Sequence, residues 1–394
     1  MKKFVRLLPL LALTMTMACK PRPAAPSEEQ SITAHGQAAG KWLATIAIGG
    51  GVSHDATVYL SDVLKKNFLS ARGGGYTSAF HLVDDKVSFP DKNLIRKSFS
   101  DLKKMIASYK AAQPHAPTMV VLGLTGHGIS RVALPLIDES YVMVIDNRDL
   151  EFKNPQSTMS GRELAEWIAD LGADETIVFF QSCLSGNLTK LDFVSKYAQT
   201  LANEATRRRT SIAVITPVSE LIESPLKGIE PLIENSLNDA GAGGDFITYA
   251  QFKDALVRRA CEHPAYYPSA SIADPTSVGP SLLLGFDDLA TGLDPQFFEN
   301  IRPNLPLMLT PTGLQKWNSK TLPFPPSAPV SQAVPVSERT QKICLDRQKQ
   351  MAERIKSDNA VRAALKDIFP LCENESDPMS CAERKLQNLP DKGR

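Results

Sequence analysis

The sequence has little that would mark it for nucleic-acid, nucleotide or metal binding. Its 44 basic and 43 acidic side chains leave a net charge of +1, so no positive surplus is present to bind a phosphate backbone. Gly49-Gly50-Gly51 has neither the G-x-G-x-x-G spacing nor a following P-loop lysine, and a tight turn after a strand is its ordinary interpretation. No C-x-x-C occurs and no histidine follows His263. We therefore expect no metal, no cofactor and no nucleic-acid partner.

Long apolar runs are absent as well. Residues 1–18 have three basic side chains before a short apolar run, which is typical of a signal peptide and too short for a stable membrane span. The next residue, Cys19, resembles the cysteine that becomes lipidated in bacterial lipoproteins, although Thr16 stands where the usual box has leucine. We expect an exported protein. It is either a periplasmic or outer-membrane lipoprotein of a bacterium, held to the membrane only by a lipid on Cys19, or a soluble secreted protein.

Composition divides the remaining chain into segments. Residues 19–40 are rich in Pro, Ala, Ser and Glu without an apolar period, as in a flexible tether. Residues 41–290 have the apolar patterning of one globular domain. Eight prolines between positions 303 and 335 predict an extended linker over residues 291–337. Residues 338–394 have apolar residues at helical spacing and predict a small helical C-terminal region.

Within residues 41–290, short apolar runs alternate with segments of helical period. The runs predict strands at residues 43–48, 79–83, 118–128, 142–145, 176–186, 211–216 and 281–285. The periodic segments predict helices at residues 56–67, 94–109, 164–171, 190–207 and 248–259, two of them with capping signals at Ser160–Glu163 and Thr248. Residues 217–244 are interpreted as a long loop. This alternation predicts right-handed βαβ units in a mostly parallel sheet.

Two of these strands end in reactive side chains. The run TMVVLGLTGHG delivers His127, and the run TIVFFQSCLSG delivers Cys183. Open α/β sheets place their chemistry outside the carboxyl ends of the strands, so neighbouring strands would bring the two side chains to one edge. An imidazole can accept the thiol proton and later protonate a departing amine. The backbone at Gly128 and at Cys183 is our candidate oxyanion hole.

Either residue alone would be unremarkable. A buried cysteine is usually a small core residue, and a histidine at a strand end usually makes a structural hydrogen bond. Here the histidine precedes the cysteine by 56 positions with a helix between them, and this order and spacing are those of caspases.

The chain resembles the caspase/legumain clan of cysteine peptidases through TGHG at residues 125–128 and QSCLSG at residues 181–186, over about two thirds of its length. The resemblance implies a caspase-like three-layer α/β sandwich with a mostly parallel sheet. It also implies that His127 is the general acid/base, that Cys183 is the nucleophile, and that the backbone at Gly128 and Cys183 forms the oxyanion hole. The ending C-L-S-G is closer to legumains and metacaspases than to caspases.

The substrate pocket is weakly marked. Caspases use a glutamine two positions before the nucleophile, matched here by Gln181, with arginines from other loops to bind an acidic side chain, whereas metacaspases have aspartate there and bind basic ones. His54 and Asp55, in the turn after Ser53, either line a pocket or lie in a solvated turn. The residue after which the chain would cleave stays open.

Four cysteines are disulfide candidates in an exported protein: Cys261, Cys344, Cys372 and Cys381. They allow three connectivities, and the sequence does not choose among them. Legumains have a disulfide-linked helical C-terminal region that covers the active site, so the resemblance suggests an autoinhibitory role for residues 338–394.

We therefore expect a cysteine endopeptidase that hydrolyses a polypeptide substrate through an acyl-enzyme. One alternative is a peptide transferase or transamidase, in which an amine replaces water. The other is a catalytically silent caspase-like binding lipoprotein. Oligomeric state and processing are open.

Overall fold

The structure, a computed structural model, describes residues 40–48, 54–83, 91–130, 141–145, 154, 156–182, 185, 196, 211–217, 229–242, 244–263, 295–319, 322 and 329–350. All of them belong to one unit of the chain, Ala39–Arg394. The predicted signal peptide, Cys19 and nearly all of the predicted tether lie outside the described residues, as do the predicted strand at 281–285, all but Lys196 of the predicted helix at 190–207, and the C-terminal region beyond residue 350.

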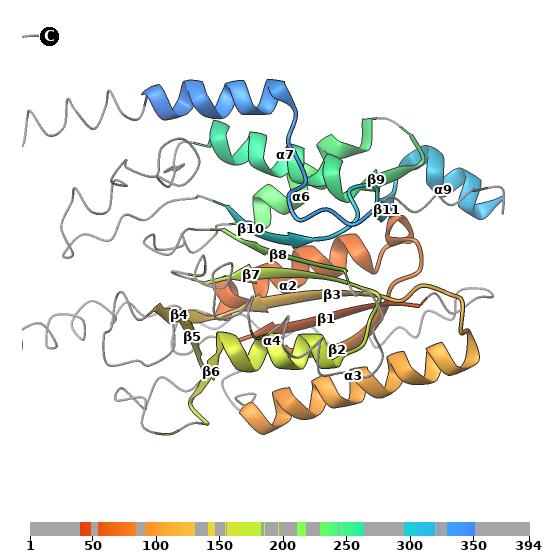
Figure 1. Cartoon of the computed structure of the whole chain (residues 1–394), viewed down its shortest axis with the longest axis vertical. Helices are drawn as coiled ribbons and strands as arrows, with labels where there is room; N and C mark the ends of the chain where they lie inside the picture. Colours follow the sequence, from red (N-terminus) through yellow and green to blue (C-terminus); the bar gives the residue numbers. More distant parts are fainter. Residues whose placement is uncertain are drawn as a thin grey trace, which may run out of the picture. The chain divides into compact units, whose positions relative to one another are not determined.

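A six-stranded sheet forms the centre of this unit (Figure 1). Its strand order is β10-β8-β7-β3-β1-β2, and every pair is parallel except the antiparallel pair β10–β8. The strands are β1 (Lys41–Ala47), β2 (Thr77–Val83), β3 (Met119–Thr125), β7 (Glu175–Gln181), β8 (Ser211–Thr216) and β10 (Gln296–Asn300). Every residue of β3, β7 and β8 is buried, as expected of parallel strands that are covered on both faces. The predicted α/β fold with a mostly parallel sheet is confirmed.

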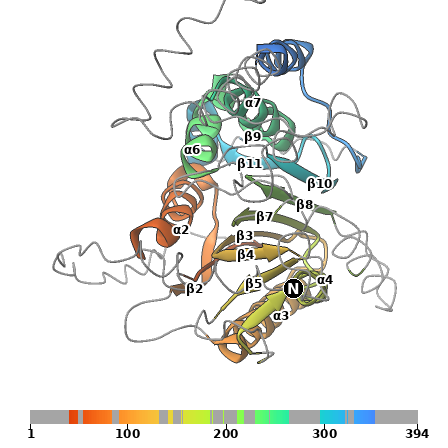
Figure 2. The same ribbon diagram turned by 90° about the vertical axis from the view of Figure 1, so that its left-hand side faces the viewer.

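Helices cover both faces of the sheet and give three layers (Figure 2). One face packs against α2 (His54–Phe68), α6 (Ile229–Asp239) and α7 (Tyr249–Glu262), and the other against α3 (Lys92–Ala112) and α4 (Gly161–Asp170). Successive residues of a strand point to opposite faces. Accordingly, Phe179 lies in the first hydrophobic cluster and Phe180 in the second.

Side-chain caps fix the starts of α3, α4 and α7. The Asp91 carboxylate accepts a hydrogen bond from Leu94 N (2.7 Å) and caps α3. Capping boxes begin α4, with Ser160 and Glu163, and α7, with Thr248 and Gln251. Such caps satisfy N–H groups that have no partner within the helix, and they confirm the two capping signals in the sequence.

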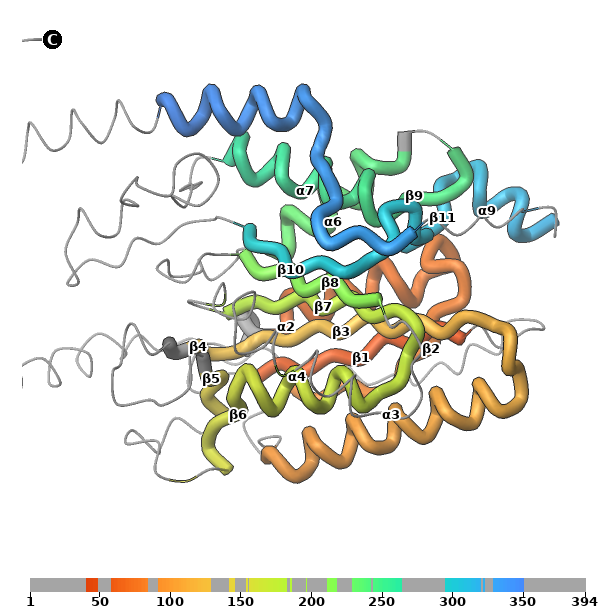
Figure 3. Tube along the Cα trace, in the orientation of Figure 1, coloured from red at the N-terminus to blue at the C-terminus, as the bar shows by residue number. Residues whose placement is uncertain are grey.

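Two small antiparallel sheets accompany the large one. One joins β4 (His127–Ser130), β5 (Tyr141–Val144) and β6 (Thr158–Ser160), and the other pairs β9 (Phe246–Thr248) with β11 (Pro306–Leu309). Figure 3 shows β4, β5 and β6 at the end of the main sheet where β3 finishes. The chain therefore turns from β3 directly into the strand that begins with His127.

The stretch interpreted as an extended linker, residues 291–337, belongs in part to the folded unit, and our expectation was wrong there. It supplies β10 to the main sheet, β11 to a small sheet, and the helix α9 (Pro311–Asn318). Two of its prolines occupy positions that tolerate them. Pro306 is the first residue of a strand in a two-stranded sheet, and Pro311 is in the first turn of α9.

The expectation of a long loop over residues 217–244 was also wrong, because α6 occupies Ile229–Asp239. Its buried side chains recur at helical spacing and fill the space between α2 and α7: Ile229, Leu232, Ile233 and Leu237. His54 and Asp55, expected in a turn, are instead the first two residues of α2.

Residues 329–350 are fastened to the sheet layers in two ways. A disulfide joins Cys261 of α7 to Cys344, which lies in the helical stretch 338–350, with a Cα–Cα distance of 5.1 Å. Glu299 of β10 accepts hydrogen bonds from Lys253 Nζ (2.6 Å) and Val334 N (3.0 Å). All three residues are buried. The other two disulfide candidates, Cys372 and Cys381, lie outside the described residues.

Candidate active site at the carboxyl edge of the sheet

The strand order reverses between β1 and β3. From β1 the chain passes to β2 on one side, whereas β3, β7 and β8 follow one another on the other side. Ligands of open α/β sheets bind at such a switch point, outside the carboxyl ends of the strands. Beyond the strands themselves, Ile48 N donates to Thr125 O (2.9 Å) and Gly126 N donates to Gln181 O (3.1 Å). These bonds hold the ends of β1, β3 and β7 together at that edge.

His127 follows this edge directly. It is the first residue of β4 and pairs with Val144 of β5, so a small antiparallel sheet holds its backbone. The imidazole is half-buried, and burial lowers its pKa below the usual 6.5 because the charged form loses hydration. The ring is therefore neutral at neutral pH and has a nitrogen free of a proton, as a general base requires.

Gly126 leaves little room for a side chain at the bend before His127. A Cβ there would lie 2.4 Å from Met143 Cε and 3.3 Å from Ile48 O. Contacts below 3.0 Å require a neighbour to move, so a larger residue would displace Met143 of β5 or the bend itself. The glycine thus lets β4 and β5 approach the end of β1 closely.

Cys183 lies outside the described residues, but the strand that leads to it is well defined. Gln181 is the last residue of β7 and stands opposite Thr125 of β3 in the parallel register. His127 is two residues beyond Thr125, and Cys183 is two residues beyond Gln181. Two residues of chain span about 7 Å at most. Ser182 and Ser185, on either side of Cys183, are buried.

The other predicted site residues divide into two groups. Gly128 is half-buried and faces Met143 in the β4–β5 register, so the structure brings it, His127 and Gln181 to one edge. The backbone of His54 and Asp55 begins α2, but their side chains are outside the described part of the structure.

The start of α6 lies next to this edge, which was not predicted from the sequence. Ile229 N donates to Gln181 Oε1 (3.1 Å), and Ile229 and Glu230 are fully buried. The signal was present in the helical spacing from Ile229 onward and in Pro231, since proline is well tolerated in the first turn of a helix. The long, loop-like composition before it concealed that signal.

A second histidine, His81 of β2, belongs to a polar cluster in the sheet. Lys65 Nζ donates to His81 Nε2 (2.7 Å), and the other ring nitrogen meets Thr45 Oγ1 and Ser61 Oγ. Burial, with Lys65 nearby, lowers the pKa of His81 to about 4. Its ring is occupied by structural partners from β1 and α2.

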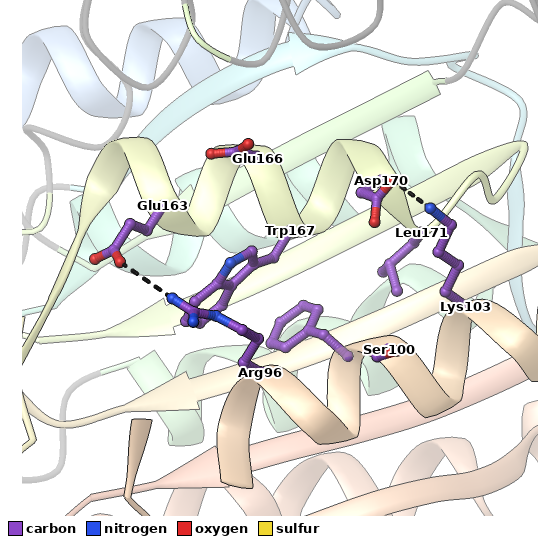
Figure 4. A pocket seen from close by; sticks show the side chains of 9 residues that line it. Arg96, Ser100, Lys103, Glu163, Glu166, Trp167, Asp170 and Leu171 are labelled. Atoms are coloured by element: carbon purple, nitrogen blue, oxygen red, sulfur yellow. Dashed lines mark hydrogen bonds and ion pairs between the residues drawn. The ribbon is translucent and has the colours of Figure 1, made fainter. Parts of the chain in front are cut away.

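A cavity of about 440 Å³ lies between α3 and α4 (Figure 4). Its charged residues already have partners, because Arg96 pairs with Glu163 (3.8 Å), Lys103 pairs with Asp170, and the Arg96 guanidinium lies over the ring of Trp167. Neither cysteine nor histidine is among its lining residues. The cavity is a seam between two helices and lacks the cysteine and the histidine that the two sequence motifs would supply.

Within the described part of the chain, no group of three or more His, Cys, Asp or Glu could hold a metal ion. No helix among the same residues is long and apolar enough to cross a membrane.

Comparison with known proteins finds similarity only among solved structures. No protein-family model matches the chain, and no curated protein sequence matches it. Caspase-1 from Spodoptera frugiperda is similar, with 13% identity and a TM-score of 0.34 over 68% of this chain and 88% of that one. A secreted C11 cysteine protease from Bacteroides thetaiotaomicron, solved with an irreversible peptide inhibitor, is 11% identical with a TM-score of 0.34. That match covers 66% of this chain and 65% of the other. Both similarities concern the overall fold.

Proposed function

We propose that this protein is a cysteine endopeptidase in which Cys183 is the nucleophile and His127 the general acid/base. The observation that supports the dyad is the register of β3 and β7. Thr125 and Gln181 stand opposite each other, and each is followed after one residue by a member of the dyad. The two strands that precede the dyad thus end side by side, at the edge where α/β folds hold their ligands.

The proposed reaction begins with proton transfer from the Cys183 thiol to the neutral imidazole of His127. The thiolate attacks the carbonyl carbon of the scissile peptide bond, and the resulting imidazolium protonates the departing amine as the C–N bond breaks. The acyl group is then held as a thioester on Cys183. A water molecule, deprotonated by His127, attacks the thioester, and the acid product and the free thiol are released.

Backbone N–H groups at Gly128 and Cys183 would stabilise the negative charge that develops on the carbonyl oxygen. Glycine at 128 allows a substrate to approach the backbone closely. The site needs no metal or organic cofactor for these steps, because the dyad supplies both the nucleophile and the proton transfers.

We also propose that the chain is exported and that Cys19 is lipidated. The Cys261–Cys344 disulfide supports export, because disulfides persist in oxidising compartments. Expression with radiolabelled palmitate tests for the lipid. We expect wild type to incorporate the label and Cys19→Ala not to. Label that survives in Cys19→Ala would refute the assignment of Cys19 as the lipidated residue.

Covalent labelling tests the peptidase. The purified mature chain, kept non-reduced, is treated with peptidyl acyloxymethyl ketones that differ at the P1 residue, and the adduct is located by mass spectrometry. The disulfide removes Cys261 and Cys344 from competition. We expect an adduct on Cys183 only, lost in Cys183→Ala and formed at least 100-fold more slowly in His127→Ala.

Two matched variants control this experiment. His115→Ala removes an exposed histidine in the segment between α3 and β3, and Cys372→Ala removes a cysteine of the C-terminal region. Both are expected to label like wild type. A folded chain that takes no probe at Cys183, with residues 338–394 present or removed, would refute the peptidase and favour a binding protein. Transfer of the acyl group to an added amine in preference to water would instead identify a transferase.

A further inference from the structure

Gln181 connects three elements at the proposed catalytic edge. It ends β7, its backbone oxygen accepts the hydrogen bond from Gly126 N (3.1 Å), and its side-chain oxygen accepts the one from Ile229 N (3.1 Å). Gly126 is the residue before His127, and Ile229 begins α6. The side chain itself is buried. One residue thus joins the nucleophile strand, the bend before the histidine, and a helix 48 positions later in the sequence.

The Ile229 N–H needs this partner. The first four N–H groups of a helix have no acceptor within the helix, and a buried N–H without an acceptor is strongly disfavoured. Ile229 is fully buried, so water cannot take this role. The Gln181 carboxamide therefore caps α6 from a distant strand, a task that Thr248 performs locally for α7.

From these contacts we propose that Gln181 is a positioning residue. Its carboxamide fixes the start of α6 against the end of β7, and its backbone fixes the bend before His127, so that the dyad and the adjacent helix keep one arrangement. This rests on the proposed peptidase function. It differs from what the resemblance to caspases implies, namely that this glutamine contacts the substrate side chain, because it assigns the side-chain oxygen of Gln181 to Ile229 N.

Two substitutions separate positioning from substrate contact. Gln181→Met keeps the length and volume of the side chain but removes the acceptor, whereas Gln181→Glu keeps an oxygen acceptor for Ile229 N. If Gln181 positions, Gln181→Met lowers kcat by about 10-fold or more, leaves KM within about twofold, and leaves the ratios of kcat/KM between P1 residues unchanged. Gln181→Glu, whose buried carboxyl group desolvation keeps neutral, then keeps most of the activity and the same P1 preference.

Hydrogen exchange provides a measurement that does not depend on catalysis. In Gln181→Met the amide of Ile229 is expected to exchange on the order of 10-fold faster, and in Gln181→Glu at nearly the wild-type rate. Gln251→Met is the matched control, since it removes the same kind of bond, Gln251 Oε1 to Thr248 N (2.9 Å), at the exposed start of α7. That variant should loosen α7 locally and leave peptide cleavage unchanged.

Each outcome decides the proposal. Unchanged exchange at Ile229 in Gln181→Met would overturn it whether or not the protein cleaves peptides. A Gln181→Glu variant that shifts its P1 preference toward lysine or arginine would overturn it in favour of substrate contact. Faster exchange at Ile229 without cleavage of any peptide by wild type would refute the peptidase and also remove the catalytic part of this proposal, while leaving the cap in place.

Discussion

The buried ion pair between Lys253 and Glu299 allows a quantitative prediction. Glu299 accepts hydrogen bonds from Tyr249 Oη (2.7 Å), Lys253 Nζ (2.6 Å) and Val334 N (3.0 Å), and its side chain is 4% exposed. The Lys253 side chain is 11% exposed, and its ammonium also donates to Val334 O (2.7 Å) and lies over the ring of Phe297. Because both side chains are buried, water cannot replace the partner of either charge.

Glu299→Gln removes one charge and keeps the shape of the side chain. Removing one partner of a buried pair costs about 3–5 kcal/mol, because the other charge remains buried without compensation. The glutamine and Val334 O still offer acceptors, so we expect about 3 kcal/mol for Glu299→Gln and a similar loss for Lys253→Met. The double variant leaves no buried charge unpaired. We expect it to cost about 3–4 kcal/mol, well below the sum of the two, with a coupling energy of about 2–3 kcal/mol.

Urea unfolding followed by tryptophan fluorescence, with the disulfide oxidised, measures these free energies. Asp101→Asn is the control, because Asp101 pairs with Lys97 and Lys104 on the exposed face of α3 and should have no measurable effect on unfolding. Single variants that each cost less than about 1 kcal/mol, or a double variant whose cost equals the sum, would refute the argument that this pair is buried and mutually dependent.

Three further predictions concern the rest of the molecule. Because the pKa of His81 is about 4 in the folded chain and 6.5 in the unfolded chain, the unfolded state binds the proton first as the pH falls. The contribution of His81 to the free energy of unfolding is therefore complete above pH 6.5 and declines between pH 6.5 and about 4. We expect a decline of about 1–2 kcal/mol after allowance for partial solvent exposure. Urea unfolding of His81→Gln should lack this part of the decline. The Cys261–Cys344 disulfide spans 83 positions, so Cys261→Ser should lower the free energy of unfolding by about 4 kcal/mol, and reductant should destabilise wild type but not the variant in thermal melts. Gly126→Ala places a Cβ 2.4 Å from Met143 Cε and 3.3 Å from Ile48 O. It should cost about 1–3 kcal/mol in urea unfolding and slow the labelling of Cys183. An alanine variant that labels at the wild-type rate would contradict the need for glycine at this bend.

The parallel sheet was predictable because its strands are buried on both faces. Such strands read as continuous apolar runs, and the capping residues Ser160 and Thr248 mark helix starts locally. The neighbourhood of β3 and β7 followed from the helix between them, since a strand, a helix and a strand joined by short connections form a βαβ unit.

Other parts depended on contacts that no local pattern contains. β10 includes a charged residue, Glu299, that is acceptable in a buried position only because Lys253, 46 positions away, pairs with it. The prolines at the start of β11 and just after it suggested a linker, and only the fold shows that both occupy positions that tolerate proline. Likewise, the hydrogen bond between Gln181 and Ile229 joins a predicted strand to α6, a helix in the stretch that we interpreted as a loop.

The antiparallel strand β10 also protects β8. The sequence of β8 is Ser-Ile-Ala-Val-Ile-Thr, with no charge and no proline, and all six residues are buried. Its outer edge bonds to β10, in which Asn300 stands opposite Ile212. A nascent chain that has not yet reached residue 296 has β8 as an open edge of high β-propensity, which is a template for aggregation. Solubility of this protein therefore depends on a strand made late in translation, and truncation before β10 should yield inclusion bodies.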